Sequence, residues 1–304
     1  MAVKTLRRIG KPVGESLYDR MSARVLHNVT WRPSMERVER EYPDLIIERD
    51  GNLLSVDPAH GNTLLYGFHN ERAFVEHFDA MFDALLPRLR KQLGDGAVRF
   101  RLSYSTARPV VEPILKRHWF SPRRDWMLFE LARTVKLPPA TVRGVKFRPG
   151  ALADLDDVVR IDDEAFPRTP IALDAMRERI SSRAETLLIA EGGKAEGIVG
   201  FALYSLPEPG EGYINIIAVA EAHRRRGIGA ALTVRAAKAL FAAGVDRVSL
   251  TTDQDNGPAI RLYVGLGFRQ TRAGRDYARP TDPRALELIK TESRGKFIKF
   301  GGWR

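Results

Sequence analysis

Three consecutive arginines stand directly before two closely spaced glycines in the stretch His-Arg-Arg-Arg-Gly-Ile-Gly-Ala, residues 223–230. An extended apolar run precedes this stretch and a helical pattern follows it. A helix that begins at a glycine turn presents unpaired backbone N–H groups and the positive end of its dipole. Glycine lets the backbone curl around an anion, and arginine adds permanently charged donors. The pattern Arg224-x-x-Gly227-x-Gly229 therefore predicts a site for a phosphate or pyrophosphate.

The pattern differs from the common nucleotide-binding motifs. No Gly-Lys-Ser/Thr follows it, so it is not a Walker loop, and it lacks the third glycine of the Rossmann fingerprint. The type of ligand must therefore be inferred from the elements around the loop.

A second group of polar residues follows in the segment Asn256-Gly-Pro-Ala-Ile-Arg-Leu-Tyr263. Tyr263 lies with Ala259, Leu262 and Leu266 at i, i+3, i+4, i+7 spacing, so it could simply belong to the core. Asn256 could be the N-cap of a helix that begins near Pro258.

Extended and helical patterns alternate around these residues. Strands are predicted at 145–149, 186–190, 197–206, 213–219, 245–252 and from 268 onward. Helices are predicted at 153–166, 171–182, 228–243 and 258–266. This order predicts an α/β chain of the α+β type, with a mixed sheet and helices packed against it.

The first half of the chain repeats this plan more faintly. A hairpin is predicted to turn at Asp50-Gly51, followed by a strand over 62–68 and a helix over 71–92. Residues 98–120 and 247–268 both read as strand, loop, proline-started helix and an aromatic residue that opens a strand. We therefore predict two related domains at 1–138 and 139–280, with an extension at 281–304.

The order strand, R-x-x-G-x-G, helix, strand, Asn256, Tyr263, Gly267-Phe268 resembles the GNAT acetyltransferase superfamily. The resemblance covers residues 145–279 well and the first half only in plan. It implies two tandem GNAT-like acyl-CoA N-acyltransferase domains. It also implies acetyl-CoA as cosubstrate, no metal, and direct attack by a neutral amine on the thioester.

The resemblance assigns roles to particular residues. Tyr263 matches the tyrosine that often protonates the leaving thiolate, and Asn256 matches a position that often contacts the cofactor. The exposed main chain of Ile217, Ala218 and Val219 would bind the pantetheine arm. The pyrophosphate would be held by the loop residues Arg224, Arg225, Arg226, Gly227, Ile228, Gly229 and Ala230.

The general base stays open. A carboxylate is common in the family on the strand at 213–219, where this chain offers Tyr213 and Asn215. Glu211, Asp253 and Asp255 are further candidates, and so is a water relay. Asp162-Asp-Glu164 could attract a cationic amine or could be an exposed acidic turn.

The first half reads Phe68-His-Asn-Glu-Arg-Ala-Phe74 at the position of the phosphate loop. It has no glycine pair, and it places a carboxylate where a phosphate would sit. We therefore predict a degenerate domain that does not bind acetyl-CoA. It would shape the acceptor pocket or replace a dimer partner, in a chain that is a monomer or a homodimer.

These observations predict an N-acetyltransferase for a primary amine of a small molecule or peptide. The alternative is a non-catalytic acyl-CoA-binding or interaction protein that retains the CoA-binding loop. The six histidines show no metal-ligand pairing.

Composition limits the partners and the compartment. The net charge is +11, with +6 over residues 1–142 and +5 over the remainder, an even spread that does not point to nucleic acid. The chain has no cysteine, no apolar run long enough to span a bilayer, and no secretory signal pattern at 1–17, which predicts a cytoplasmic protein without a membrane partner. The tail could pack on the first half or contact nucleic acid through basic and aromatic residues, namely Lys290, Arg294, Lys296, Phe297, Lys299, Phe300, Trp303 and Arg304.

Overall fold

A computed structural model gives the fold of this chain. It describes residues 16–28, 32–58, 61–94, 96–103, 107–167, 170–181, 185–208, 210–282 and 284–287. The predictions for the N-terminal residues 1–15 and for the tail from residue 288 lie outside these described residues. The described residues form two compact units, 16–123 with 276–287, and 124–275.

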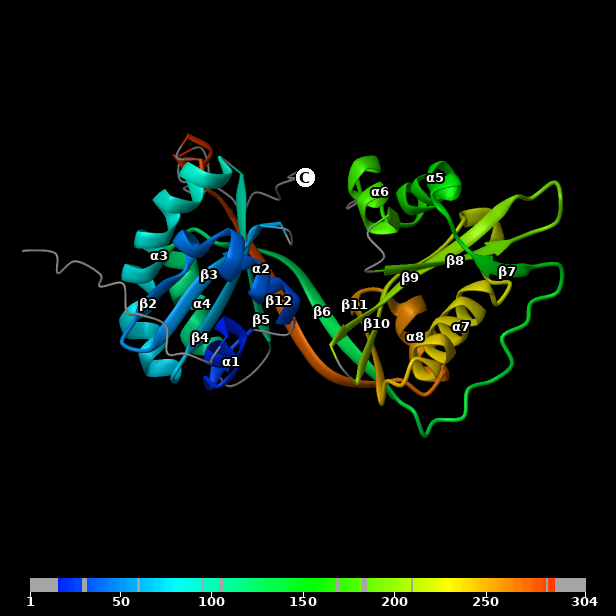
Figure 1. The fold of residues 1–304 in the computed structure, drawn as a ribbon, viewed down its shortest axis with the longest axis horizontal. Coiled ribbons are helices and arrows are strands. Elements are labelled where there is room, and N and C mark those ends of the chain that lie inside the picture. Colours follow the sequence, from blue (N-terminus) through cyan, green and yellow to red (C-terminus); the bar gives the residue numbers. More distant parts are fainter. Residues whose placement is uncertain are drawn as a thin grey trace, which may run out of the picture. The chain divides into compact units, whose positions relative to one another are not determined.

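The second unit carries the phosphate-loop pattern (Figure 1). Its helices are α5 Leu155–Ala165, α6 Leu173–Ser181, α7 Ile228–Ala242 and α8 Gly257–Gly265, with short 3₁₀ turns at Leu152–Asp154 and Glu221–His223. Its own strands are β7 Lys146–Pro149, β8 Glu185–Glu191, β9 Ile198–Glu208, β10 Glu211–Val219 and β11 Arg247–Asp253. The strands lie in the order β11-β10-β9-β8-β7, and only the β10–β11 pair among them is parallel.

Helices cover both faces of the second unit's sheet. Val158 and Ile161 of α5 pack with Phe201 and Ile216 on one face. Leu232 of α7 packs with strand residues on the other face. Burial alternates along β10 between buried and partly buried residues, so one face of this strand is covered more completely than the other, because successive strand side chains point to opposite faces.

The first unit follows the same plan (Figure 1). Its helices are α1 Leu17–Ser22, α2 Arg32–Glu41, α3 Glu71–Leu93 and α4 Arg108–Arg117, with a 3₁₀ turn at Pro43–Leu45. Its strands are β1 Leu26–His27, β2 Ile47–Arg49, β3 Asn52–Asp57, β4 Thr63–Phe68 and β5 Ala97–Ser103. The strand order is β2-β3-β4-β5, and β1 pairs with β4. Phenylalanines of β4, α3, β5 and the segment before β6 dominate its core.

Two long strands contribute residues to both units. β6 spans Ser121–Ala132 and β12 spans Arg269–Pro280. Residues 124–132 of β6 belong to the second unit, where they pair antiparallel with β11 from Arg247↔Ala132 to Asp253↔Trp126. Residues 276–280 of β12 belong to the first unit, next to β5.

The compact units therefore do not coincide with the predicted ranges 1–138 and 139–280. The sequence halves exchange strands, since the late strand of each half is shared with the other unit's sheet. The start of the predicted extension belongs to the first unit, where the Thr281 amide donates to the carbonyl oxygen of Gly96 at 2.8 Å. None of the helices in the described part of the chain has the length and apolar character that a bilayer crossing requires.

Candidate functional site

Strand β10 parts from β11 halfway along its length. It pairs with β9 as far as Val219, but its parallel pairing with β11 runs only from Glu211 to Ile214. A register shift between Ile214 and Ile216 marks a bulge at the point of separation. The described residues offer no strand partner for the last part of this edge. The main-chain groups of Ile217 and Val219 face this open edge, so a ligand can bind along it. The predicted contact through Ala218 is wrong, because its main-chain groups face β9, as the Ala220 amide does in donating to the Val199 oxygen at 3.0 Å.

The N-terminus of α7 lies directly after this strand. Its N-cap is Gly227, which has φ 82° and supplies no side-chain cap. The first turn also contains no acidic residue. The amides of Ile228, Gly229 and Ala230 are thus left for an anion, and the helix dipole favours negative charge there.

Gly229 lies close to both neighbouring elements. A Cβ atom at this position would be 3.5 Å from Leu262 Cδ1 of α8 and 3.7 Å from Val219 Cγ2 of β10. These are ordinary contact distances, so a methyl group fits. Because the Cα–Cβ bonds of a helix tilt toward its N-terminus, we expect a longer side chain at this position to extend toward the N-terminus of α7.

The three arginines of the loop have different partners. Arg224 donates to the main-chain oxygens of Val219 at 3.2 Å and Glu164 at 3.3 Å. Arg226 forms an ion pair with Glu196 at 2.9 Å, and its Nη1 lies 2.7 Å from His223 Nδ1. This ion pair lowers the pKa of Glu196. Arg225 has φ 64° and makes no hydrogen bond or ion pair to another described residue.

Asn256 is the N-cap residue of α8 and Tyr263 lies within this helix, and each has a structural role. The Asn256 side chain caps the helix by accepting from the Ala259 amide at 3.2 Å. The Tyr263 ring packs 6.1 Å from that of Phe129 and 5.9 Å from that of Phe268. Burial, and secondarily the phenol of Tyr213, raise the pKa of Tyr263 to about 12. The phenol therefore stays protonated near neutral pH and can serve as a proton donor.

The candidate bases are mostly engaged in other interactions. Glu211 forms an ion pair with Arg247, and Asp253 forms one with Arg124 at 3.0 Å. The Tyr213 hydroxyl donates to Thr251 Oγ1 at 2.6 Å, and Asn215 Nδ2 donates to Ser205 Oγ at 2.9 Å. Asp255 is exposed. This arrangement does not single out one of them as the base.

The Acetyltransferase (GNAT) family model matches residues 155–268, which include the parted strand, the loop and α8. Residues 155–268 are a GNAT-family acetyltransferase domain. The GNAT domain thus has an open main-chain edge at the end of β10 and an uncapped helix N-terminus at the predicted loop.

Curated relatives match about half of the length of this chain. A mycothiol acetyltransferase from Kineococcus radiotolerans is 37% identical over 45% of this chain and 45% of that protein. One from Actinosynnema mirum is 31% identical over 51% of this chain and 55% of that protein. The chain thus spans about half the length of the curated relatives it matches. A tandem GNAT protein from the clavulanic acid biosynthesis pathway shares the fold, with a TM-score of 0.62 at 13% identity over 88% of this chain and 94% of that one.

The acidic segment at the end of α5 divides into two environments. Asp163 and Glu164 of the GNAT domain are exposed, as an acidic turn would be. Asp162 is instead fully buried, and its Oδ2 accepts from the Ile171 amide at 2.8 Å. Its Oδ1 has no hydrogen-bond partner among the described residues, and burial raises its pKa. Asp162 therefore ties the start of the α6 segment to α5.

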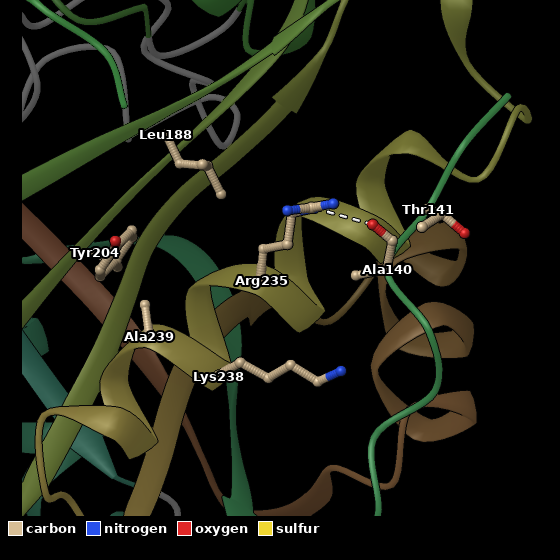
Figure 2. Close-up of a pocket in the computed structure, with 7 residues that line it drawn as sticks. All are labelled: Ala140, Thr141, Leu188, Tyr204, Arg235, Lys238 and Ala239. Carbon is tan, nitrogen blue, oxygen red and sulfur yellow. Dashed lines mark hydrogen bonds between the residues drawn. The ribbon is translucent and has the colours of Figure 1, made fainter. Parts of the chain in front are cut away.

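A cavity of about 390 Å³ in the GNAT domain lies apart from these residues. Figure 2 shows it between α7, strands β8 and β9 and the segment that precedes β7. The Arg235 guanidinium donates to the Ala140 oxygen at 2.9 Å and stacks 4.2 Å from the Phe147 ring centre. None of the predicted site residues lines this cavity. It marks where the segment around residue 140 crosses α7.

Proposed function

We propose that this chain transfers the acetyl group of acetyl-CoA to a primary amine of a small molecule or peptide, using the GNAT domain. The observation that carries this proposal is the uncapped N-terminus of α7 at Gly227, next to the free edge of β10. The helix N-terminus suits a pyrophosphate, and the open strand edge suits a ligand that contains amides, such as the pantetheine arm.

The loop and the end of β10 would bind different parts of the cosubstrate. Amides from Arg225 to Ala230 would hold the pyrophosphate, and the main chain of Ile217 and Val219 would bind the pantetheine arm. The Val219 oxygen already accepts from Arg224, so its amide is the group left for this role. Acetyl-CoA supplies the thioester, and the chain supplies position and charge.

The proposed reaction needs one proton to be donated and two to be removed. The neutral amine nitrogen bonds to the thioester carbonyl carbon, the C–S bond breaks, and the thiolate takes a proton from Tyr263. The nitrogen then gives up its second proton, which passes through water and restores the Tyr263 phenol. The ammonium form of the acceptor must first lose a proton. Since Glu211 and Asp253 are held in ion pairs with arginines and Asp255 is exposed to solvent, we infer that this proton leaves to water. The value of kcat/KM should then rise with pH up to the pKa of the acceptor amine.

The acceptor can be sought by screening amines. The match to mycothiol acetyltransferases supports placing the acceptor of those enzymes first in the screen. Simple primary amines and peptide N-termini complete it, with release of the CoA thiol as the readout.

Replacement of Tyr263 by Phe tests the proposed acid. We expect kcat to fall by about 10²-fold, because general acid catalysis typically contributes 10²–10⁴-fold, while the affinity for acetyl-CoA stays unchanged. Tyr204→Phe is the matched control, since Tyr204 lines the separate cavity and should leave kcat unaltered.

Two results would contradict this account. Equal kcat for the wild type and Tyr263→Phe would remove the acid role from Tyr263. Binding of acetyl-CoA without turnover of any amine would favour a non-catalytic acyl-CoA-binding protein.

A further inference from the structure

The first unit also contains a strand that parts from its parallel neighbour. β4 pairs with β3 along its whole length, from Asp57↔Thr63 to Leu53↔Gly67. On its other edge the parallel pairing with β5 is limited to Thr63↔Arg99. β4 and β5 thus correspond to β10 and β11, and their separation would leave the edge of β4 beyond Thr63 unpaired.

A short segment of the chain occupies this edge. Leu26 and His27 form β1 and pair antiparallel with Phe68 and Gly67. Gly67 is already paired with Leu53 of β3, so β1 must lie on the opposite edge of β4, which is the edge that β5 leaves. The position that is open in the GNAT domain is therefore filled in the first unit.

Asn28 continues this contact with its main chain and its side chain. Its amide donates to the Tyr66 oxygen at 3.3 Å, and its Oδ1 accepts from the Tyr66 amide at 2.9 Å. Its Nδ2 donates to the Leu64 oxygen at 2.7 Å. One asparagine thus satisfies three main-chain groups of β4. In the second unit a bound ligand would meet the corresponding groups of β10.

Residues just before the segment contact neighbouring parts of the first unit. The backbone of Met21 in α1 lies 3.0 Å from the position that a Cβ atom on Gly67 would take, so α1 packs directly on β4. Arg24, just before β1, donates to the Gly51 oxygen at 2.8 Å. Within the unit, the Tyr66 ring stacks 4.7 Å from Phe100 of β5.

The helix that follows β4 is closed to anions. The Asn70 side chain caps α3 by accepting from the Ala73 amide at 2.9 Å, and Glu71 places a carboxylate in the first turn. Both features differ from the N-terminus of α7, which has neither a side-chain cap nor an acidic residue. A pyrophosphate would have to displace the cap and approach a negative charge.

We propose that Leu26–Asn28 is a built-in occupant of the first unit's strand gap, taking the place of an acyl-CoA arm and closing this unit to acyl-CoA. The inference concerns contacts within the first unit alone, so it stands whether or not the second unit catalyses acetyl transfer.

Hydrogen–deuterium exchange of the full chain, resolved to single amides within residues 62–74 and 216–230, tests this proposal. In the wild type we expect the Tyr66 amide to exchange at least tenfold more slowly than in Asn28→Ala. Saturating acetyl-CoA should slow exchange in 216–230 and leave 62–74 unchanged.

The outcomes separate the two units. Slowing of exchange in 62–74 by acetyl-CoA, or an unprotected Tyr66 amide in the wild type, would overturn the proposal. The wild-type measurement suffices even if Asn28→Ala does not fold. No effect of acetyl-CoA at 216–230 would count against the proposed function and leave the first-unit inference to be judged by Tyr66 alone.

Discussion

In the loop before α7, Arg224 and Arg226 contact different parts of the second unit. Arg224 joins the end of β10 to the end of α5, and Arg226 joins the loop to Glu196 between β8 and β9. Both guanidinium groups are therefore engaged within the protein. Arg225 is the one whose charge is left for a phosphate group, within the described residues.

This difference predicts unequal effects of two similar substitutions. Arg225→Ala should weaken acetyl-CoA binding by about tenfold or more, since a hydrogen bond to a charged group contributes roughly 1.5–3 kcal/mol. Arg226→Ala should change the affinity by less than about threefold, because its exposed ion pair is of the kind worth about 1 kcal/mol or less. Titration calorimetry on the two variants decides this, and equal losses would mean that both side chains contact the ligand.

Asp162 allows a prediction about pH. Its raised pKa means that the folded state holds a proton more tightly than the unfolded state. Its contribution to stability is present below the unfolded pKa and is lost as pH rises through the folded pKa. Asn keeps an acceptor for the Ile171 amide without the charge, so the stability of Asp162→Asn relative to the wild type should increase as the pH is raised from 4 to 8.

Urea denaturation of both proteins at pH 4 and pH 8 measures this effect. The stability of Asp162→Asn relative to the wild type should be lower at pH 4 than at pH 8. A difference that is the same at both pH values would show that Asp162 does not titrate with folding.

The sequence predicts candidate site residues but not all of the partners that the structure gives them. The glycines, Asn256 and Tyr263 could be found because their spacing within one loop or helix is a local property. Among the described residues, Arg224 and Arg226 are engaged within the protein and Arg225 is not, because their partners Glu164 and Glu196 are distant in sequence but close in the fold. The burial of Asp162 was also missed, because its neighbours Asp163 and Glu164 are exposed.

At the level of elements, the regular parts of the fold follow from local pattern. Helices α5, α7 and α8 and the Asp50-Gly51 hairpin form where periodicity, proline and positive-φ residues place them. The short elements α1, α2 and β1 were not predicted. β1 has two residues and no periodicity of its own, and it exists because β4 offers an unpaired edge.

No pattern in the sequence indicates that β6 pairs with β11 of the second unit. This pairing predicts which unit a substitution in β6 destabilises. Phe129 of β6 is buried in the second unit's core, although it lies in the first half of the sequence. Phe129→Ala should destabilise the second unit by about 3–5 kcal/mol. It should therefore speed amide exchange in 247–253, next to β6.

Leu102→Ala in β5 is the control, since Leu102 is buried in the first unit's core. It should speed exchange in the first unit only. If Phe129→Ala loosened the first unit and left 247–253 unchanged, β6 would not complete the sheet of the second unit.

For the molecule as a whole, the two units share one plan but differ at the strand edge and the helix N-terminus proposed to bind acetyl-CoA. In the second unit the edge of β10 and the N-terminus of α7 are open, and in the first the matching positions are taken by Asn28 and Asn70. The chain should therefore bind one acetyl-CoA molecule, in the second unit.

Calorimetric titration of acetyl-CoA into the full chain tests this central claim most directly, with Gly229→Glu and Gly229→Ala beside the wild type. We predict one site per chain in the wild type and in Gly229→Ala, whose methyl group fits next to Leu262. Gly229→Glu should not bind, because its carboxylate would face the phosphate site. Two sites per chain, no binding by folded wild-type protein, or undiminished binding by Gly229→Glu would contradict the account.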